Sequence, residues 1–120
     1  PLWSRGLGDV YKRQELKPLF EKPGVEWSVQ EIQDRLLYRQ AIETARCLAE
    51  GVLTSVHDAN IGSIFGIGFP AWTGGAMQFV YGTGVEAFLK RADELATKYG
   101  TGFALDTNTR NAIALSVPVY

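Results

Sequence analysis

Few side chains in this sequence are of the types that perform acid–base or nucleophilic chemistry. His57 is the only histidine among the 120 residues, and Cys47 is the only cysteine. A general base needs an orienting partner and a substrate or nucleophile within reach, and a metal site needs further His or Cys ligands. We therefore predict no catalytic residue and no metal ligand. We expect His57 on the solvent-exposed surface and Cys47 as a small buried hydrophobic residue within a helix.

One short motif is typical of dinucleotide binding. Residues 66–71, GIGFPA, satisfy the pattern G-x-G-x-x-A, and Glu86 follows at about the distance at which an acidic residue meets a ribose hydroxyl. Such a site also needs a buried strand before the first glycine and a second strand after the following helix. The preceding residues carry helix-capping signals instead, and no second strand is visible downstream. We therefore predict no cofactor-binding residue in this chain.

The longer stretch 66–75, GIGFPAWTGG, is interpreted as a packed turn between two helices. A permissive glycine backbone alternates there with bulky apolar and rigid residues, whereas a flexible linker would carry Ser and charged residues. We expect this loop to fix the angle between its flanking helices, with the glycines allowing close approach around two aromatic side chains. The predicted structural loop consists of Gly66, Gly68, Phe69, Pro70, Trp72, Gly74 and Gly75.

Charge and composition narrow the possible partners. The pairs Lys90-Arg91 and Asp93-Glu94 are interpreted as a solvated helix face. The formal net charge of −1 gives no electrostatic reason to expect nucleic acid as a partner. No run of about 18 apolar residues is present, so we expect no membrane span. A single cysteine forms no internal disulfide, which is compatible with a reducing, cytoplasmic location.

The elements that position these residues are helical by pattern. Ser28 and Glu31 form a capping box, and Gly51 is expected to end the longest helix in the left-handed conformation. Apolar residues recur between them at three- and four-residue steps and predict one apolar face. They are Val29, Ile32, Leu36, Leu37, Ala41, Ala45 and Leu48.

Three further segments show helical signals. Thr54 or Ser55 is expected to cap a second helix, which the glycine loop ends. An apolar stripe over residues 85–99 predicts a third clear helix that stops at Gly100, and residues 107–115 predict a last short helix. A brief apolar segment lies at 77–80. Because no window alternates with period two, we predict an all-α domain of four to six helices.

The start of the chain has a different character. Residues 1–14, PLWSRGLGDVYKRQ, lack the periodicity of a helix, a strand or a signal peptide, and residues 4–14 resemble the translation of a transposase-based sequencing adapter. We expect residues 1–14 to be a disordered artefact and residues 15–120 to be the domain, entered at an arbitrary point of a longer protein. Residues 15–27 are expected to dock Leu19, Phe20 and Trp27 on the domain.

The run from 35 to 89 resembles a known family. Its most specific parts are RCLAEGV (46–52) and GFPAWTGG (68–75). In this order and spacing they resemble the C-terminal helical domain of 3-hydroxyacyl-CoA dehydrogenases, and most of all the second such domain of the multifunctional α-subunit of fatty-acid oxidation complexes. The resemblance covers most of residues 17–110. It implies an all-α fold like the C-terminal domain of 6-phosphogluconate dehydrogenase.

The resemblance also implies a role. Family members oxidise an L-3-hydroxyacyl-CoA with NAD, and the NAD site, the catalytic histidine and its glutamate partner lie on a separate N-terminal domain that has no match here. This implies a fragment without cofactor or catalytic residues, which packs against the preceding helical and dinucleotide-binding domains and shapes the cleft for the acyl-CoA substrate. The parent is expected to be fused to enoyl-CoA hydratase. The sequence departs from the family at three positions, because family members commonly have an acidic residue where Asn60 stands, a proline where Ala71 stands and an aspartate where Tyr81 stands.

Two other functions fit the same residues. One is a free-standing helical interaction module that dimerises through the face around Phe69 and Trp72. The other is an independent acyl-CoA binder, which lacks a basic cluster for the phosphates.

Overall fold

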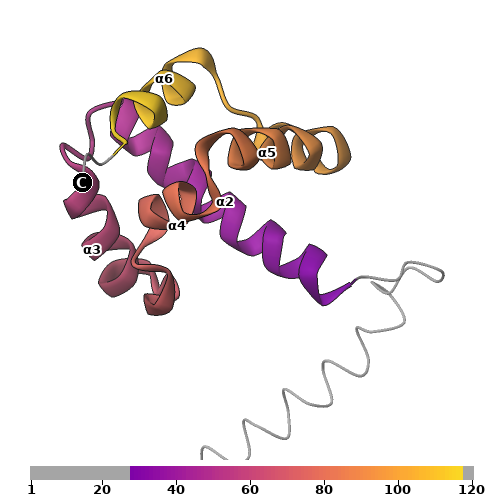
Figure 1. Cartoon of the computed structure of the whole chain (residues 1–120), viewed down its shortest axis with the longest axis horizontal. Helices are drawn as coiled ribbons and strands as arrows, with labels where there is room; N and C mark the ends of the chain where they lie inside the picture. Colours follow the sequence, from indigo (N-terminus) through magenta and orange to yellow (C-terminus); the bar gives the residue numbers. More distant parts are fainter. Residues whose placement is uncertain (1–27, 118–120) are drawn as a thin grey trace, which may run out of the picture.

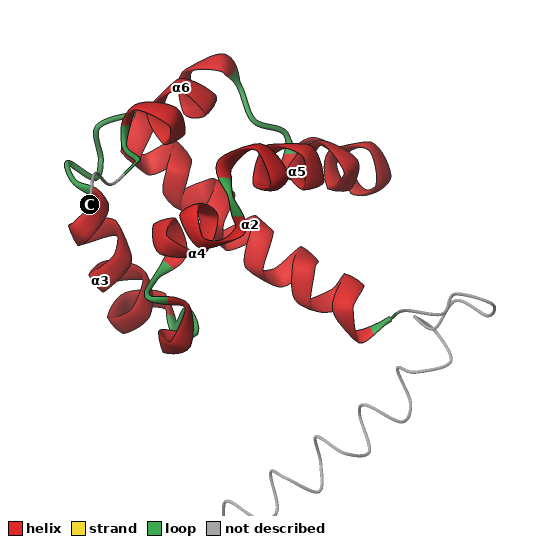
Figure 2. Cartoon of the chain, viewed as in Figure 1, coloured by secondary structure: helices red, strands yellow, loops and turns green. Residues whose placement is uncertain are grey.

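The computed structural model describes residues 28–117. This part of the chain consists of helices and connecting loops without a strand, which confirms the predicted all-α class (Figure 2). The elements are α2 (Val29–Ala49), α3 (Val56–Ile67), the 3₁₀ turn η1 (Ala71–Thr73), α4 (Ala76–Thr83), α5 (Val85–Tyr99), the 3₁₀ turn η2 (Thr101–Phe103) and α6 (Thr107–Leu115). The expected artefact at 1–14 and the expected docking of Leu19, Phe20 and Trp27 lie outside the described residues.

The long helix α2 is the element on which the others are assembled. It contacts α3, α4, α6 and η2, and α4 also contacts both α3 and α5. Figure 1 shows α2 running diagonally through the molecule, with α4 in the middle of the view. Helix α3 lies at the lower left, and α5 and α6 lie along the upper side. The glycine-rich loop therefore connects a peripheral helix, α3, to a central one, α4.

Local sequence signals explain where α2 begins and ends. The Ser28 hydroxyl accepts a hydrogen bond from the Glu31 backbone N–H at 3.1 Å, and Gly51, with φ of 78°, follows the last turn. Both ends are as predicted. The reciprocal half of the capping box is not as predicted, because the Glu31 carboxylate reaches across to α5 instead of back to Ser28.

The predicted apolar face of α2 is only half buried. Ala41 and Ala45 are fully buried, whereas Val29, Ile32 and Leu36 are exposed by 71%, 43% and 60%. The cause is that the face toward α5 in the first half of α2 carries carboxylates, which bind a cation from α5. Residues 29, 32 and 36 project along a different direction of the helix.

The core is built from aromatic and small side chains of α2, α4 and α5. The Tyr38 ring stacks on Phe88 with centroids 4.7 Å apart, and Phe79 meets Tyr38 edge-on at 5.5 Å. Phe88, Ala92 and Leu95 of the predicted α5 stripe are fully buried. Contacts of these rings in stacked and edge-to-face geometry add to the stabilisation that comes from burial.

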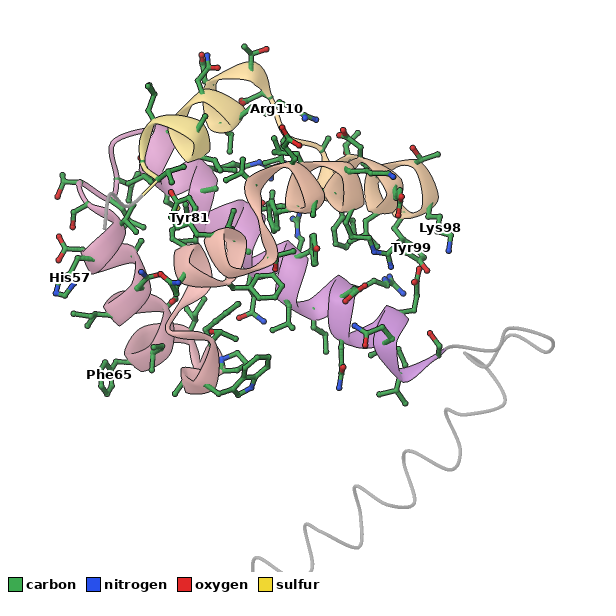
Figure 3. All side chains as sticks on the ribbon, viewed as in Figure 1. His57, Phe65, Tyr81, Lys98, Tyr99 and Arg110 are labelled. Atoms are coloured by element: carbon green, nitrogen blue, oxygen red, sulfur yellow. The ribbon has the colours of Figure 1, made fainter. Side chains whose placement is uncertain are left out.

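The last helix matches its predicted bounds. Asp106 caps α6 through a 2.7 Å hydrogen bond from the Thr109 N–H to its carboxylate. Ile113 of α6 is fully buried, and its carbonyl accepts a bond from the Tyr81 hydroxyl at 3.3 Å. Tyr81 thus ties α4 to α6 (Figure 3).

Candidate interaction surface

Large apolar side chains are exposed on two consecutive elements, α3 and η1. Ile61, Phe65 and Ile67 of α3 are exposed by 45%, 85% and 60%, and Trp72 of η1 is exposed by 80%. Figure 3 shows Phe65 pointing away from the other helices. These four residues are called the α3–η1 surface below.

Helix α3 is apolar toward solvent as well as toward the core. Its inner face buries Ala59 and Ser63, and its outer face carries Ile61 and Phe65. Asp58 is the one formally charged side chain in the helix. Exposed apolar side chains that gather on one element mark an interaction site, so Ile61 and Phe65 give α3 the character of a helix with a second packing partner.

The two aromatic residues of the glycine-rich loop lie in different environments, one in the core and one in solvent. Phe69 is 2% exposed and its ring lies 5.9 Å from that of Phe79 in the core, whereas Trp72 stands out on η1. Between them the Thr73 hydroxyl donates a 2.7 Å hydrogen bond to the Pro70 carbonyl and closes the turn. The loop is thus anchored by Phe69 and presents Trp72.

The glycines of the loop have different roles. Gly66 is still helical, so α3 extends two residues into the predicted loop, and Gly68 with φ of 72° ends it. Gly75, with φ of 119°, lies where a Cβ atom would be 2.5 Å from the Asn60 Cα. Close approach between α3 and the start of α4 therefore depends on Gly75, whereas a Cβ at Gly66 or Gly68 would meet nothing within 4 Å.

Side chains of α3 cap the N-terminus of α4. The Ala76 N–H donates to the Ser63 hydroxyl at 2.9 Å, and the Gln78 N–H donates to the Asn60 side-chain oxygen at 2.8 Å. Gly75, the N-cap residue, has no side chain for this purpose. The amide oxygen of Asn60 thus satisfies an otherwise orphan backbone donor.

The charged face predicted on α5 is not wholly solvated. Arg91 lies between the helices and donates to Glu31 at 2.7 Å, to Asp34 at 3.1 Å and to Glu94 at 3.2 Å. Its side chain is only 24% accessible, and that of Glu31 only 17%. The pattern of charges on α5 alone did not indicate that α2 supplies two carboxylates in the matching position.

Glu31 also binds the end of α5. The Tyr99 hydroxyl donates to it at 2.7 Å and Lys98 lies 3.2 Å away (Figure 3). The hydrogen bonds from Tyr99, Arg91 and Lys98 lower the pKa of Glu31 to about 2. This carboxylate is therefore ionised and fully engaged at neutral pH, which makes it a structural clasp between α2 and α5 and a poor general base.

The two residues with reactive side chains lie apart. His57 is exposed, as predicted, on the first turn of α3 (Figure 3). Cys47 is half-buried, where full burial was predicted, and lines a groove of about 370 Å³ between α2 and α3. Within residues 28–117, no three His, Cys, Asp or Glu side chains come together as metal ligands, and no helix has the length and hydropathy of a membrane span.

Comparison with known proteins finds relatives that include several fatty acid oxidation complex alpha subunits. No protein-family model matches the chain. The fatty acid oxidation complex subunit alpha of Shewanella oneidensis is 35% identical over 82 residues, which are 68% of this chain and 12% of that protein. The subunit of the same name from Vibrio parahaemolyticus is 40% identical over 62 residues, 52% of this chain and 9% of that protein.

A longer match comes from Aliivibrio fischeri, whose fatty acid oxidation complex subunit alpha is 37% identical over 101 residues, 78% of this chain and 15% of that protein. In these relatives the matched region spans only 9% to 15% of the length. The chain is therefore homologous to a small part of the fatty acid oxidation complex subunit alpha.

Proposed function

We propose that this chain is a non-catalytic C-terminal domain of a cytoplasmic fatty-acid β-oxidation enzyme. The parent is an NAD-dependent L-3-hydroxyacyl-CoA dehydrogenase fused to enoyl-CoA hydratase. The domain packs against the preceding helical and dinucleotide-binding domains of the same polypeptide and shapes the cleft that receives the acyl-CoA substrate. NAD and the catalytic residues belong to those other domains.

The α3–η1 surface is the observation that carries this proposal. Soluble monomers seldom expose large apolar patches, and helices that are apolar on all sides are normally covered. The homologous relatives extend far beyond the matched region, which spans 12% of the Shewanella oneidensis subunit. A longer polypeptide of that kind supplies the surface that Phe65 and Trp72 need.

The side chains of the described residues are consistent with a packing role. Oxidation of a hydroxyl group by hydride transfer needs a base near the substrate oxygen. His57 stands exposed on α3, and Glu31 is held ionised by three donors. The oxygens of Glu31 accept from Arg91, Lys98 and Tyr99, and this arrangement joins α2 to α5.

A chimera tests the proposal. The 82 matched residues of this chain replace their counterpart in the Shewanella oneidensis subunit. We expect a soluble chimera that reduces NAD with a 3-hydroxyacyl-CoA substrate. Phe65→Asp or Trp72→Asp is expected to lower this activity at least about tenfold, because a charge would be buried at the domain contact.

The matched control is Thr54→Asp, which places the same charge at an exposed polar residue of the loop before α3. It is expected to leave the activity of the chimera within about twofold, since surface substitutions away from contacts have small effects. Equal activity of all three variants and the parent chimera would contradict the proposed docking role.

The same surface also favours the second candidate, a module that forms homodimers. Sedimentation analysis of the full 120-residue chain separates the two functions. A tight dimer that Phe65→Asp dissociates would support the module, whereas docking within one polypeptide does not require self-association. Upstream sequence of the gene gives an independent test, because only a β-oxidation parent should encode a strand–glycine turn–helix for NAD.

A further inference from the structure

We propose that the groove between α2 and α3 receives apolar side chains of a helix from another domain of the same polypeptide. This inference rests on the proposed function and identifies a second part of its docking surface. The groove and the α3–η1 surface share Ile67, which lines the groove and is 60% exposed. Ile67 is thus both an exposed apolar residue and part of the groove wall.

The groove exists because small residues face each other across it. Thr44 and Cys47 of α2 stand opposite Ala59 and Gly62 of α3. A Cβ atom at Gly62 would meet nothing within 4 Å. The space of about 370 Å³ would hold roughly a dozen water molecules. Protein interiors are normally close-packed, so an unfilled apolar groove of this size between two helices is suited to side chains from outside the described residues.

The polar groups around the groove favour a protein partner over a small ligand. Arg39 pairs with Glu43 at 3.5 Å and donates to the Gly102 carbonyl. The Thr44 hydroxyl donates to the Gln40 carbonyl at 2.9 Å. A ligand site needs a few polar groups that converge on the ligand and orient it. Arg39, Glu43 and Thr44 are engaged within the domain, and Asp58 is the other formally charged residue of the lining, so the groove itself is suited to an apolar helix face.

The occupant is assigned to the same polypeptide because of the relatives. The matched region is 12% of the Shewanella oneidensis subunit, so most of such a protein lies outside it. Covalent linkage gives a neighbouring domain a high effective concentration. Under that condition, apolar contacts in the groove are enough to hold a helix in place without polar anchors.

Cys47 provides the measurement. It is the only cysteine of the chain and it lines the groove. The rate of maleimide labelling at Cys47 is measured by mass spectrometry in the full chain alone and in the chimera described above. We expect labelling to be at least about tenfold slower in the chimera, because an inserted helix would cover the sulfur. Equal rates in an active chimera would overturn the groove assignment and leave the proposed function standing.

Two substitutions at Gly62 refine the test. Both Gly62→Ala and Gly62→Leu should stabilise α3, because Gly is a poor helix former and the site is open. Only the leucine fills the groove. In the chimera, Gly62→Leu is expected to lower activity by about tenfold because its side chain takes the place of the incoming helix, whereas Gly62→Ala is expected to leave activity unchanged. Thermal unfolding of the isolated chain checks that both variants fold.

The results separate the two proposals. An inactive chimera in which Cys47 is nevertheless shielded would support the groove and contradict the proposed enzyme role. An active chimera that tolerates Gly62→Leu without change would contradict the groove alone.

Discussion

At the scale of single residues, the domain depends on a few side chains that make contacts far away in sequence. The backbone N–H of Glu31 takes part in the N-terminal cap of α2. Its carboxylate accepts hydrogen bonds from three side chains on α5. Phe88 has no accessible surface and stacks on Tyr38. By contrast, Phe65 is equally large and aromatic but faces solvent.

The clasp at Glu31 predicts a dependence of stability on pH. Because its pKa is lowered from 4.5 to about 2 in the folded state, its ionised form stabilises the fold above the unfolded pKa. That stabilisation is lost as the pH falls from about 4.5 to about 2. We expect Glu31→Gln to lower the melting temperature at pH 7 and to weaken its decline over this acid range.

Circular dichroism during heating at a series of pH values measures the effect. Glu86→Gln, at an exposed position of helix α5, is the control and should keep the acid decline of the unsubstituted chain. An unchanged decline in Glu31→Gln would show that the clasp does not form in solution.

Two phenylalanines test the assignment of core and surface. Phe88→Ala is expected to cost about 3–5 kcal/mol in the free energy of unfolding, because it opens a cavity in the core. Phe65→Ala is expected to change it by less than about 0.5 kcal/mol in the isolated chain. Denaturant titration measures both. Similar losses for the two variants would mean that α3 is packed differently from the structure.

At the scale of elements, most of the fold was predictable because helix signals are local. Ser28, Ser55 and Asp106 each cap the helix that follows them, and Gly51 and Gly100 stand where helices end. The C-terminal end of α3 was not predicted, since Gly66 is compatible with either a helix or a loop. Helix α3 ends at Gly68, because Gly68 and not Gly66 has the left-handed backbone conformation.

The junction between α3 and α4 can be tested at its glycine. Gly75→Ala is expected to cost at least about 1 kcal/mol, because a side chain at positive φ is strained and its Cβ would overlap the Asn60 backbone. Gly62→Ala is expected to raise stability by about 0.4–1 kcal/mol. Chemical unfolding of both variants measures the difference, and a neutral Gly75→Ala would contradict the close approach.

At the scale of the whole molecule, the sequence was less informative because tertiary partners come from distant segments. Nothing in residues 85–99 alone indicates that Arg91 meets Glu31 and Asp34 of α2. For the same reason the exposure of Ile32 and Leu36 was not foreseen. Phe69 and Trp72 were predicted to lie on one face. In the structure Phe69 is buried and anchors the loop, whereas Trp72 is exposed.

The capping of α4 by α3 has a consequence for how this domain folds. With eight residues and a glycine N-cap, α4 is too short to persist by itself, and its first amides are satisfied by Asn60 and Ser63. The two helices are therefore expected to form and melt together as one cooperative unit. A partner that holds α3 in place would then also secure the centre of the core, so that binding of that partner and completion of folding would be thermodynamically coupled.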